Sequence, residues 1–160
     1  MGKIELIGGQ VLTAKMLTLP RDIRVAVEKT AMKEANEMLA GALKQASLKH
    51  VDTGALKSSF KHDIRKCKGD NVIIGRVGVD YNVVGTVTRT KNGKKRFKKD
   101  KNATGKKRRP AKYYHLVNNG FTTKNGKTIA GSGFREEVFS RYAPVIERLF
   151  ERAVEEAFNK

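Results

Sequence analysis

The chain has 160 residues, of which 39% are hydrophobic, and carries 34 Lys and Arg against 16 Asp and Glu, a net charge of +18. This length favours one domain with one core, and no apolar run approaches the ~20 residues of a membrane span. A single cysteine, Cys67, excludes an internal disulfide. The first ten residues lack the apolar region of a signal peptide, so we expect synthesis in the cytoplasm and no membrane contact.

The N-terminal third predicts a short strand at 3–7, a short helix at 10–17, a break at Leu19-Pro20 and a long helix from Arg21 to about Leu48. Proline suits the start of a helix, because its missing N–H would have no partner there anyway. Apolar residues at steps of three and four predict one buried helical face: Ile23, Val27, Ala31, Ala35, Met38, Ala42 and Ala46.

Residues 50–60 read H-V-D-T-G-A-L-K-S-S-F. Asp52 and Thr53 suit the start of a new turn, since their side chains accept backbone N–H bonds, and Gly54 relaxes the backbone. Leu56 and Phe60, four residues apart, are expected in the core. A catalytic Asp-Thr-Gly of the aspartic-protease kind is excluded, because that chemistry needs two such loops sharing a proton and the chain has one.

Residues 72–79 and 83–90 are rich in β-branched residues and predict two strands, with a turn near Asp80-Tyr81. After a loosely alternating stretch at 60–66, these strands suggest an antiparallel meander. Gly75 and Gly78 are not a nucleotide-binding fingerprint, because no G-x-G-x-x-G pattern and no helix follow them.

Residues 89–112, which we name the basic arm, hold thirteen Lys and Arg against one acid, Asp100. The arm has almost no apolar periodicity, so we expect a long loop or extended hairpin that projects from the folded body. It is either a solvated loop, a sequence-independent contact to nucleic-acid phosphates, or a contact to an acidic protein. The candidate contact residues are Lys91, Lys94, Lys95, Arg96, Lys98, Lys99, Lys101, Lys106, Lys107, Arg108 and Arg109.

Residues 113–121 predict a short strand or helical turn that ends at Asn118-Asn119-Gly120, and residues 122–133 predict a turn-rich, mobile loop. A helix is expected from Phe134 onward, with Pro144 either bending it or marking a fresh start. Its apolar arc is broader than one contact requires and favours a second copy of the chain as partner, although a buried helix would show the same pattern. The arc comprises Val138, Tyr142, Val145, Ile146, Leu149, Ala153 and Ala157, widened by Phe139, Phe150, Val154 and Phe158.

We find no candidate active site in the sequence. The three histidines, His50, His62 and His115, are scattered, and no Ser/His/Asp arrangement, Cys/His cluster or phosphate-cradling loop is present. We therefore expect no catalytic residue, no metal, no cofactor and no small-molecule substrate.

Three segments together resemble a known family. Residues 51–60 resemble the pattern P-V-D-T-G-x-L-R-x-S-I, Tyr114 to Phe121 resemble Y-x-H-x-V-E-x-G-T, and Gly133-Phe134-Arg135 loosely match P-F-L-R-P-A. These patterns are typical of small tailed-bacteriophage proteins of the head–tail junction (neck, minor tail or tail-completion proteins), typified by gene product ten of a lambda-like phage. The matched positions are Asp52, Thr53, Gly54, Leu56, Ser59, Tyr114, His115, Val117, Gly120 and Phe134.

The family also opens with a short strand, a short helix, a Leu-Pro break and a long Ala-rich helix, matched here by Ile4 to Gly9, Val11 to Leu17, Leu19-Pro20 and Arg21 to Ser47. The resemblance therefore spans nearly the whole chain except the basic arm, with departures at Asn118-Asn119, at Phe121 and in the eroded proline segment. It implies a non-catalytic virion protein that forms a ring, expected to be a hexamer, between the head connector on the portal side and the tail tube. The basic arm would then contact an acidic partner ring or DNA in the lumen. The alternative is a cellular nucleic-acid-binding protein associated with ribosomes or the nucleoid.

The fold expected is α+β, in a single domain at 1–160: a small, mainly antiparallel sheet with a long N-terminal and a C-terminal helix packed on it. The basic arm is inserted in that domain.

Overall fold

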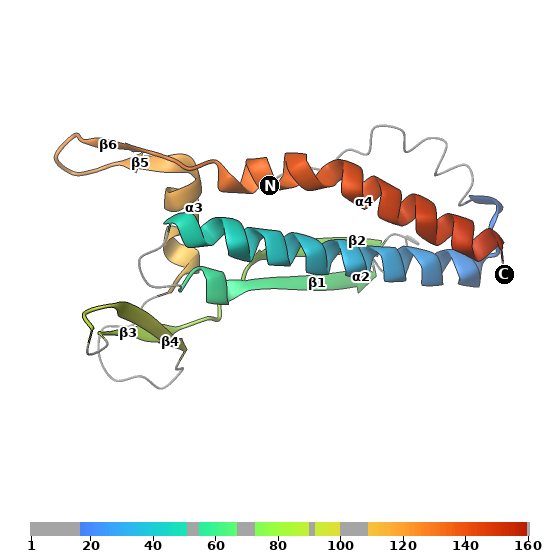
Figure 1. Cartoon of the computed structure of the whole chain (residues 1–160), viewed down its shortest axis with the longest axis horizontal. Coiled ribbons are helices and arrows are strands. Elements are labelled where there is room, and N and C mark those ends of the chain that lie inside the picture. The colour runs from blue at the N-terminus through green and yellow to red at the C-terminus, as the bar shows by residue number, and fades with distance from the viewer. Residues whose placement is uncertain (1–16, 51–54, 67–72, 90–91, 100–108, 160) are drawn as a thin grey trace. The chain divides into compact units, whose positions relative to one another are not determined.

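The computed structural model describes residues 17–50, 55–66, 73–89, 92–99 and 109–159. The α+β class is confirmed, with one long helix towards each end of the chain and paired strands between them (Figure 1). The elements are α2 (Arg21–Ala46), the 3₁₀ turns η1 (Ser47–His50) and η2 (Lys57–Ser59), β1 (Phe60–Lys66), β2 (Ile73–Val79), β3 (Gly85–Arg89), β4 (Lys95–Lys99), α3 (Ala111–Asn119), β5 (Gly120–Thr122), β6 (Thr128–Ala130) and α4 (Phe134–Phe158). The strand expected at 3–7 and nearly all of the helix expected at 10–17 lie outside the described residues.

Helix α2 begins directly after the Leu19-Pro20 break, as the sequence predicts. The N–H of Arg24 donates to the carbonyl of Pro20 (2.9 Å), and Asp22 in the first turn and Lys44 in the last complement the helix dipole.

The predicted buried face of α2 is only partly correct. Ala31 and Ala35 are buried, but Ile23 is exposed and Val27, Met38, Ala42 and Ala46 are half-buried. The predicted stripe takes one step of three, from Ala35 to Met38, and then runs along the edge of the buried face. A step of four from Ala35 leads instead to Leu39 and on to Leu43, which are buried. The buried residues that the sequence pattern missed are Asn36, Leu39, Ala40, Leu43 and Ser47.

The strands form three separate two-stranded sheets within the described residues, rather than the one small sheet expected from the sequence. β3 pairs with β4 and β5 pairs with β6, both antiparallel. β1 and β2 pair across a six-residue connection, which is too short for a parallel crossover. The strands predicted at 72–79 and 83–90 and the turn at Asp80-Tyr81 are confirmed.

Two expectations for residues 113–133 need correction. The short strand or helical turn is the nine-residue helix α3, which ends at Gly120 with φ 82°. The expected mobile loop at 122–133 is the β5–β6 hairpin, whose turn is tied by Thr123. The Thr123 hydroxyl donates to the carbonyl of Lys127 (3.0 Å) and accepts from its N–H (3.1 Å).

The chain separates into two compact units, each assembled from segments that are distant in the sequence. Unit 1 comprises residues 1–39, 62–77 and 138–160, and unit 2 comprises residues 40–61 and 78–137. The single domain expected from length stays a prediction.

In unit 1, helix α2 packs against both the β1–β2 pair and α4 (Figure 1). The Asn36 amide donates to the carbonyl of Asp63 on β1 (3.2 Å), and Arg152 of α4 lies 3.5 Å from the Glu34 carboxylate. Gly75 on β2 lies so close to Asn36 that a Cβ there would come within 2.6 Å of its side-chain oxygen. The absence of a side chain at Gly75 therefore lets strand and helix approach each other.

Helix α4 runs unbroken from Phe134 to Phe158 with Pro144 inside it, so no fresh start occurs at the proline. The buried side chains are Phe134, Val138, Ile146, Phe150 and Val154, whereas Val145 and Phe158 are exposed. None of the described helices is both long and apolar enough to cross a membrane.

Candidate functional site

The segments that carry the family resemblance meet in the core of unit 2. Phe60, Tyr114 and Phe134 pack edge-to-face around one another, with ring centroids 5.9 Å apart for Phe60–Tyr114, 6.4 Å for Phe60–Phe134 and 5.9 Å for Tyr114–Phe134. Such pairs add about 0.5–1.5 kcal/mol each beyond the burial of their surface. Burial also raises the pKa of the Tyr114 phenol above its ordinary value.

The residues around Phe60 behave as the sequence predicts. Leu56 and Phe60 are both buried, as expected. Ser59 is buried as well, and its hydroxyl donates to the carbonyl of Leu56 (2.7 Å), which closes the turn before β1. The predicted capping residues Asp52, Thr53 and Gly54 lie outside the described residues.

The remaining matched positions shape the junction between α3, the β5–β6 hairpin and α4. Val117 is half-buried, and its carbonyl accepts hydrogen bonds from the N–H (3.0 Å) and the hydroxyl (2.9 Å) of Ser132. Gly120 adopts a positive φ and lies against the backbone of Ile129 and Gly131, so only glycine fits there. His115 is exposed on α3.

Asn118 is a buried polar residue that the sequence analysis did not single out. Its side-chain oxygen accepts from the N–H of Arg135 (2.9 Å) in the first turn of α4, and its amide donates to the Glu136 carboxylate (2.8 Å). Partial desolvation acts in the opposite direction, but hydrogen bonds from Asn118 and Arg135, together with the Arg135 charge, lower the pKa of Glu136. Asn118, near the end of α3, thus anchors the start of α4.

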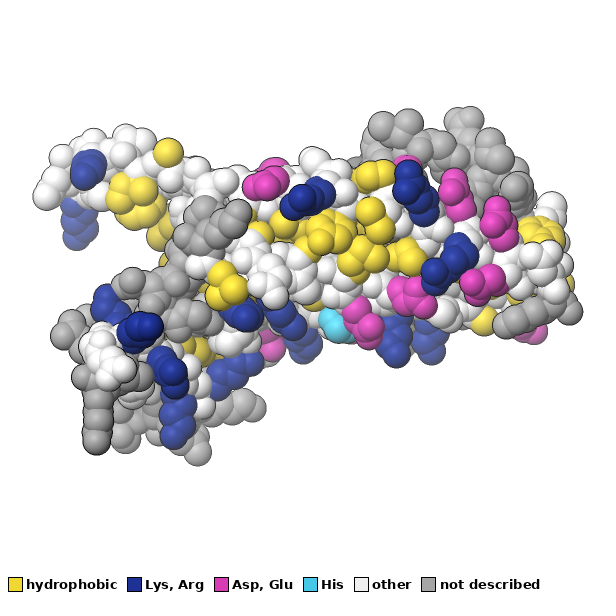
Figure 2. Space-filling model, in the orientation of Figure 1, with side chains coloured by type: hydrophobic (Ala, Val, Ile, Leu, Met, Phe, Trp, Pro, Cys, Tyr) yellow, Lys and Arg dark blue, Asp and Glu magenta, His cyan; other side chains and the backbone are white. Residues whose placement is uncertain are grey.

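The basic arm is a hairpin over the part that the structure describes, which confirms one of its two expected forms. β3 and β4 pair from Gly85↔Lys99 to Arg89↔Lys95, with Gly93 at φ 73° in the turn. Lys94, Lys95, Arg96, Lys98, Lys99 and Arg109 are exposed, and dark-blue side chains gather over this hairpin in Figure 2. Lys91, Lys101, Lys106, Lys107 and Arg108 lie outside the described residues.

The register divides the hairpin into two faces, because successive side chains of a strand alternate and cross-strand partners share a face. Val87 and Phe97 are partners and half-buried, and Lys95 and Lys99 share their face. Thr86 and Thr88 lie opposite Lys98 and Arg96 on the other face. Since Phe97 is half-buried against Val87, the arm offers no exposed aromatic platform for stacking bases among its described residues.

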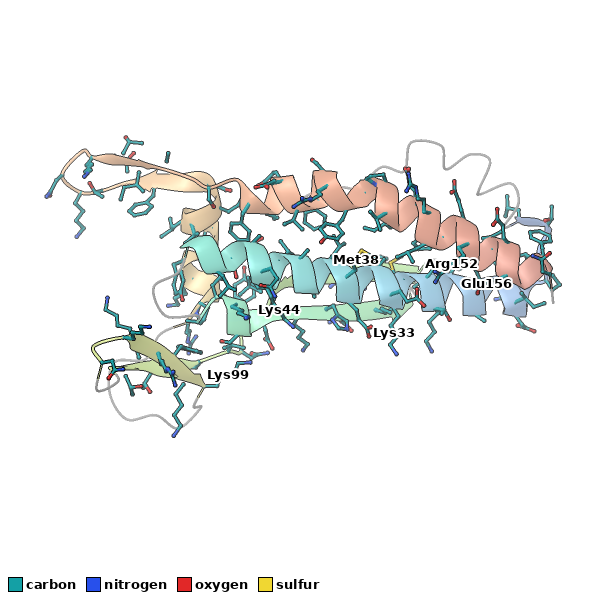
Figure 3. All side chains as sticks on the ribbon, viewed as in Figure 1. Lys33, Met38, Lys44, Lys99, Arg152 and Glu156 are labelled. Atoms are coloured by element: carbon teal, nitrogen blue, oxygen red, sulfur yellow. The ribbon has the colours of Figure 1, made fainter. Side chains whose placement is uncertain are left out.

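Beside the hairpin, unit 2 has an open pocket of about 360 Å³ lined by Lys44, Lys57, Ser58, Phe60 and Lys99. Figure 3 labels Lys44 near the end of α2 and Lys99 at the end of β4. Lys99 was expected as a contact residue, whereas Lys44 and Lys57 were not. A signal for Lys57 existed, because it stands where the resembled motif has arginine. For Lys44 we find none, since a lysine in the last turn of a helix is ordinary.

Among the residues that the structure describes, no three His, Cys, Asp or Glu side chains are grouped as metal ligands would be. No protein-family model matches the chain, and comparisons with curated proteins and with solved structures give no significant match. The likeness to phage junction proteins therefore rests on the sequence motifs alone.

Proposed function

We propose that this chain is a structural protein of a tailed-phage virion at the head–tail junction, where copies of it form a ring between head connector and tail tube. The observation that supports this best is the meeting of Phe60, Tyr114 and Phe134 in one core. Three motif segments that lie far apart in the chain become a single packing unit. A set of motifs that serves packing suits a protein whose work is assembly.

The projecting features suit binding partners rather than a substrate. Phe121 and Ile129 are cross-strand partners on the β5–β6 hairpin, and their side chains are 38% and 41% exposed. An exposed apolar pair on a two-stranded hairpin favours a protein contact, and a neighbouring copy in the ring is the partner that we propose. The basic arm contacts an acidic partner ring or DNA in the lumen.

The first test is quantitative mass spectrometry of gradient-purified phage particles from the source strain, compared with its ribosomal fractions. We expect the protein in particles at a copy number similar to that of the portal. Absence from particles together with recovery in ribosomal or chromosomal fractions would contradict the proposal. That outcome would favour a cellular nucleic-acid-binding protein, for which the cations of the basic arm are the supporting observation.

The second test separates the apolar hairpin from the arm in a complementation assay. Phe121→Ser with Ile129→Thr should reduce incorporation into particles at least tenfold if the pair forms a ring contact worth more than about 1.4 kcal/mol. Thr122→Ala with Thr128→Ala, on the opposite face of the same hairpin, serves as the matched control. Deletion of Lys91 to Arg109 should leave folded protein but heads and tails that do not join. Normal virions from that deletion would refute the role of the arm.

A further inference from the structure

The open pocket of unit 2 brings together three lysines from three different elements. Lys44 comes from the last turn of α2, Lys57 from η2 and Lys99 from the end of β4, and Ser58 and Phe60 also line the pocket. The lining residues that the structure describes include no acidic residue. Within the described part of the chain, none of the three ammonium groups has an ion-pair partner, whereas Lys61 in the same unit lies 3.9 Å from Asp80.

This arrangement favours an anion in the pocket. Three like charges around one opening repel one another, and a bound anion converts that repulsion into attraction. The Ser58 hydroxyl donates to the carbonyl of Ala55 (2.9 Å), so its proton is already engaged. Among the described lining residues, the lysine ammonium groups are therefore the donors available to an anion.

The donor chemistry indicates a phosphate rather than a carboxylate. A planar carboxylate is recognised best by the two-pronged guanidinium of arginine, and no arginine is among the described residues that line the pocket. Lysine acts as a flexible point charge with three donors. Three such groups can approach a tetrahedral phosphate from different sides, and the cavity volume accommodates the group with its ester linkages.

The surroundings indicate that this phosphate belongs to a polymer. Lys99 is the last residue of β4, whose sequence is K-R-F-K-K, and the other three cations of that strand are exposed. Lys95 shares the face of Lys99, and Arg96 and Lys98 lie on the opposite face. Several cations beside a pocket match a chain of phosphates better than a single small anion. We propose that the Lys44–Lys57–Lys99 pocket binds one backbone phosphate of a nucleic acid, without reading its sequence. This deepens the proposed function, on which it rests, by naming the partner of the basic arm.

The test is fluorescence anisotropy of the full-length protein with a labelled 20-nucleotide DNA, single- and double-stranded, over a salt titration. Lys44→Gln with Lys57→Gln removes two pocket charges without touching the basic arm. We expect about three- to tenfold weaker binding near 100 mM salt, and a salt slope reduced by about one because one phosphate contact is lost. Lys44→Arg with Lys57→Arg keeps the charges and should keep most of the affinity.

The matched control is Lys29→Gln with Lys33→Gln, which removes the same charge from exposed positions of α2 in unit 1. An equal loss of affinity in both double variants would show that only net charge matters and would contradict the proposal that the pocket binds a phosphate. Lys99→Gln, at the exposed end of β4, repeats the test should the first double variant not fold. Unchanged DNA binding by a folded Lys99→Gln would also overturn it.

Competitors distinguish the source of the anion. Inorganic phosphate at millimolar concentration should displace the DNA only weakly, and full displacement would overturn the polymer assignment in favour of free phosphate. Pocket-dependent binding of poly-glutamate with no binding of DNA would overturn it in favour of an acidic protein. Both outcomes leave the junction proposal intact, because that proposal depends on the presence of the protein in particles. Conversely, if the protein binds DNA through the pocket but is absent from particles, the proposed phosphate site is supported and the junction role is refuted.

Discussion

The two compact units differ most in how they distribute charge. The segments of unit 1 contain 14 Lys and Arg against 11 Asp and Glu, a net charge of +3, whereas those of unit 2 contain 20 against 5, a net charge of +15. In Figure 2, positive and negative side chains are interspersed over α2 and α4, and positive ones predominate over the β3–β4 hairpin. A surface with balanced charges needs no partner to stay in solution, whereas a surface with concentrated positive charge favours the binding of a polyanion.

The units also differ in what holds them together. Unit 1 buries larger side chains of α4 such as Ile146 and Phe150, and its small residues Ala31 and Ala35 on α2 and Gly75 on β2 let its elements approach. Unit 2 relies on three aromatic rings and on the Asn118 network at the start of α4. The basic surface therefore belongs to the unit with the larger aromatic core, and this core holds the elements that carry the cations in a fixed arrangement.

The largest effect on stability is expected from truncating an aromatic side chain in the core of unit 2. Phe134 is 1% exposed, so Phe134→Ala should lower the free energy of unfolding by about 3–5 kcal/mol, through lost burial and the cavity left behind. Urea unfolding followed by circular dichroism measures this. Phe121→Ala, at an exposed position, is the matched control and should cost under about 1 kcal/mol. Similar costs for both variants would contradict the aromatic core as the main support of unit 2.

A smaller effect is expected from the close approach in unit 1. The Cβ of Gly75→Ala would meet the side-chain oxygen (2.6 Å) and nitrogen (2.8 Å) of Asn36, which is held by its bond to Asp63. We expect a loss of about 1–3 kcal/mol. Gly78→Ala on the same strand is the control: its Cβ would meet open space, so its stability should be nearly unchanged. Thermal unfolding measures both variants. Equal losses of stability would show that the replacement of a strand glycine, and not the close packing against Asn36, causes the effect.

The smallest effect is a pH dependence of opposite sign in the two units. Burial raises the pKa of Glu28 in unit 1 above the ordinary 4.5, so the stability linked to this group is present below that value and lost as the pH rises through its raised pKa. The pKa of Glu136 in unit 2 is lowered, so the stability linked to this carboxylate is present above pH 4.5 and is lost as the pH falls through the lowered pKa.

Glu28→Gln should therefore flatten the first change and Glu136→Gln the second, in urea titrations from pH 3 to pH 7. Both changes should be small, because Glu28 is only partly buried and Glu136 is largely exposed. Identical pH profiles for the two variants would contradict the opposite environments of these carboxylates.

Local patterns predicted most of the regular elements. The Leu19-Pro20 break, the 3.6-residue periodicity after it and the acidic first turn of α4 predicted both long helices, and β-branched runs predicted β2 and β3. The turn-rich sequence at 122–133 misled, because Gly and Asn signal a turn without saying whether paired strands flank it. Here Thr123 and Lys127 close a hairpin.

Local sequence patterns were enough to predict the two long helices, the position of the basic arm and the burial of Leu56 and Phe60, because each depends on neighbours within one or two turns. The pairing of the described strands in twos and the anchoring of α4 by Asn118 emerge only from tertiary contacts. The tertiary structure alone also brought Lys44 and Lys57 together with Lys99 around one pocket. These features join residues far apart in the chain, and periodicity carries no information about such pairs.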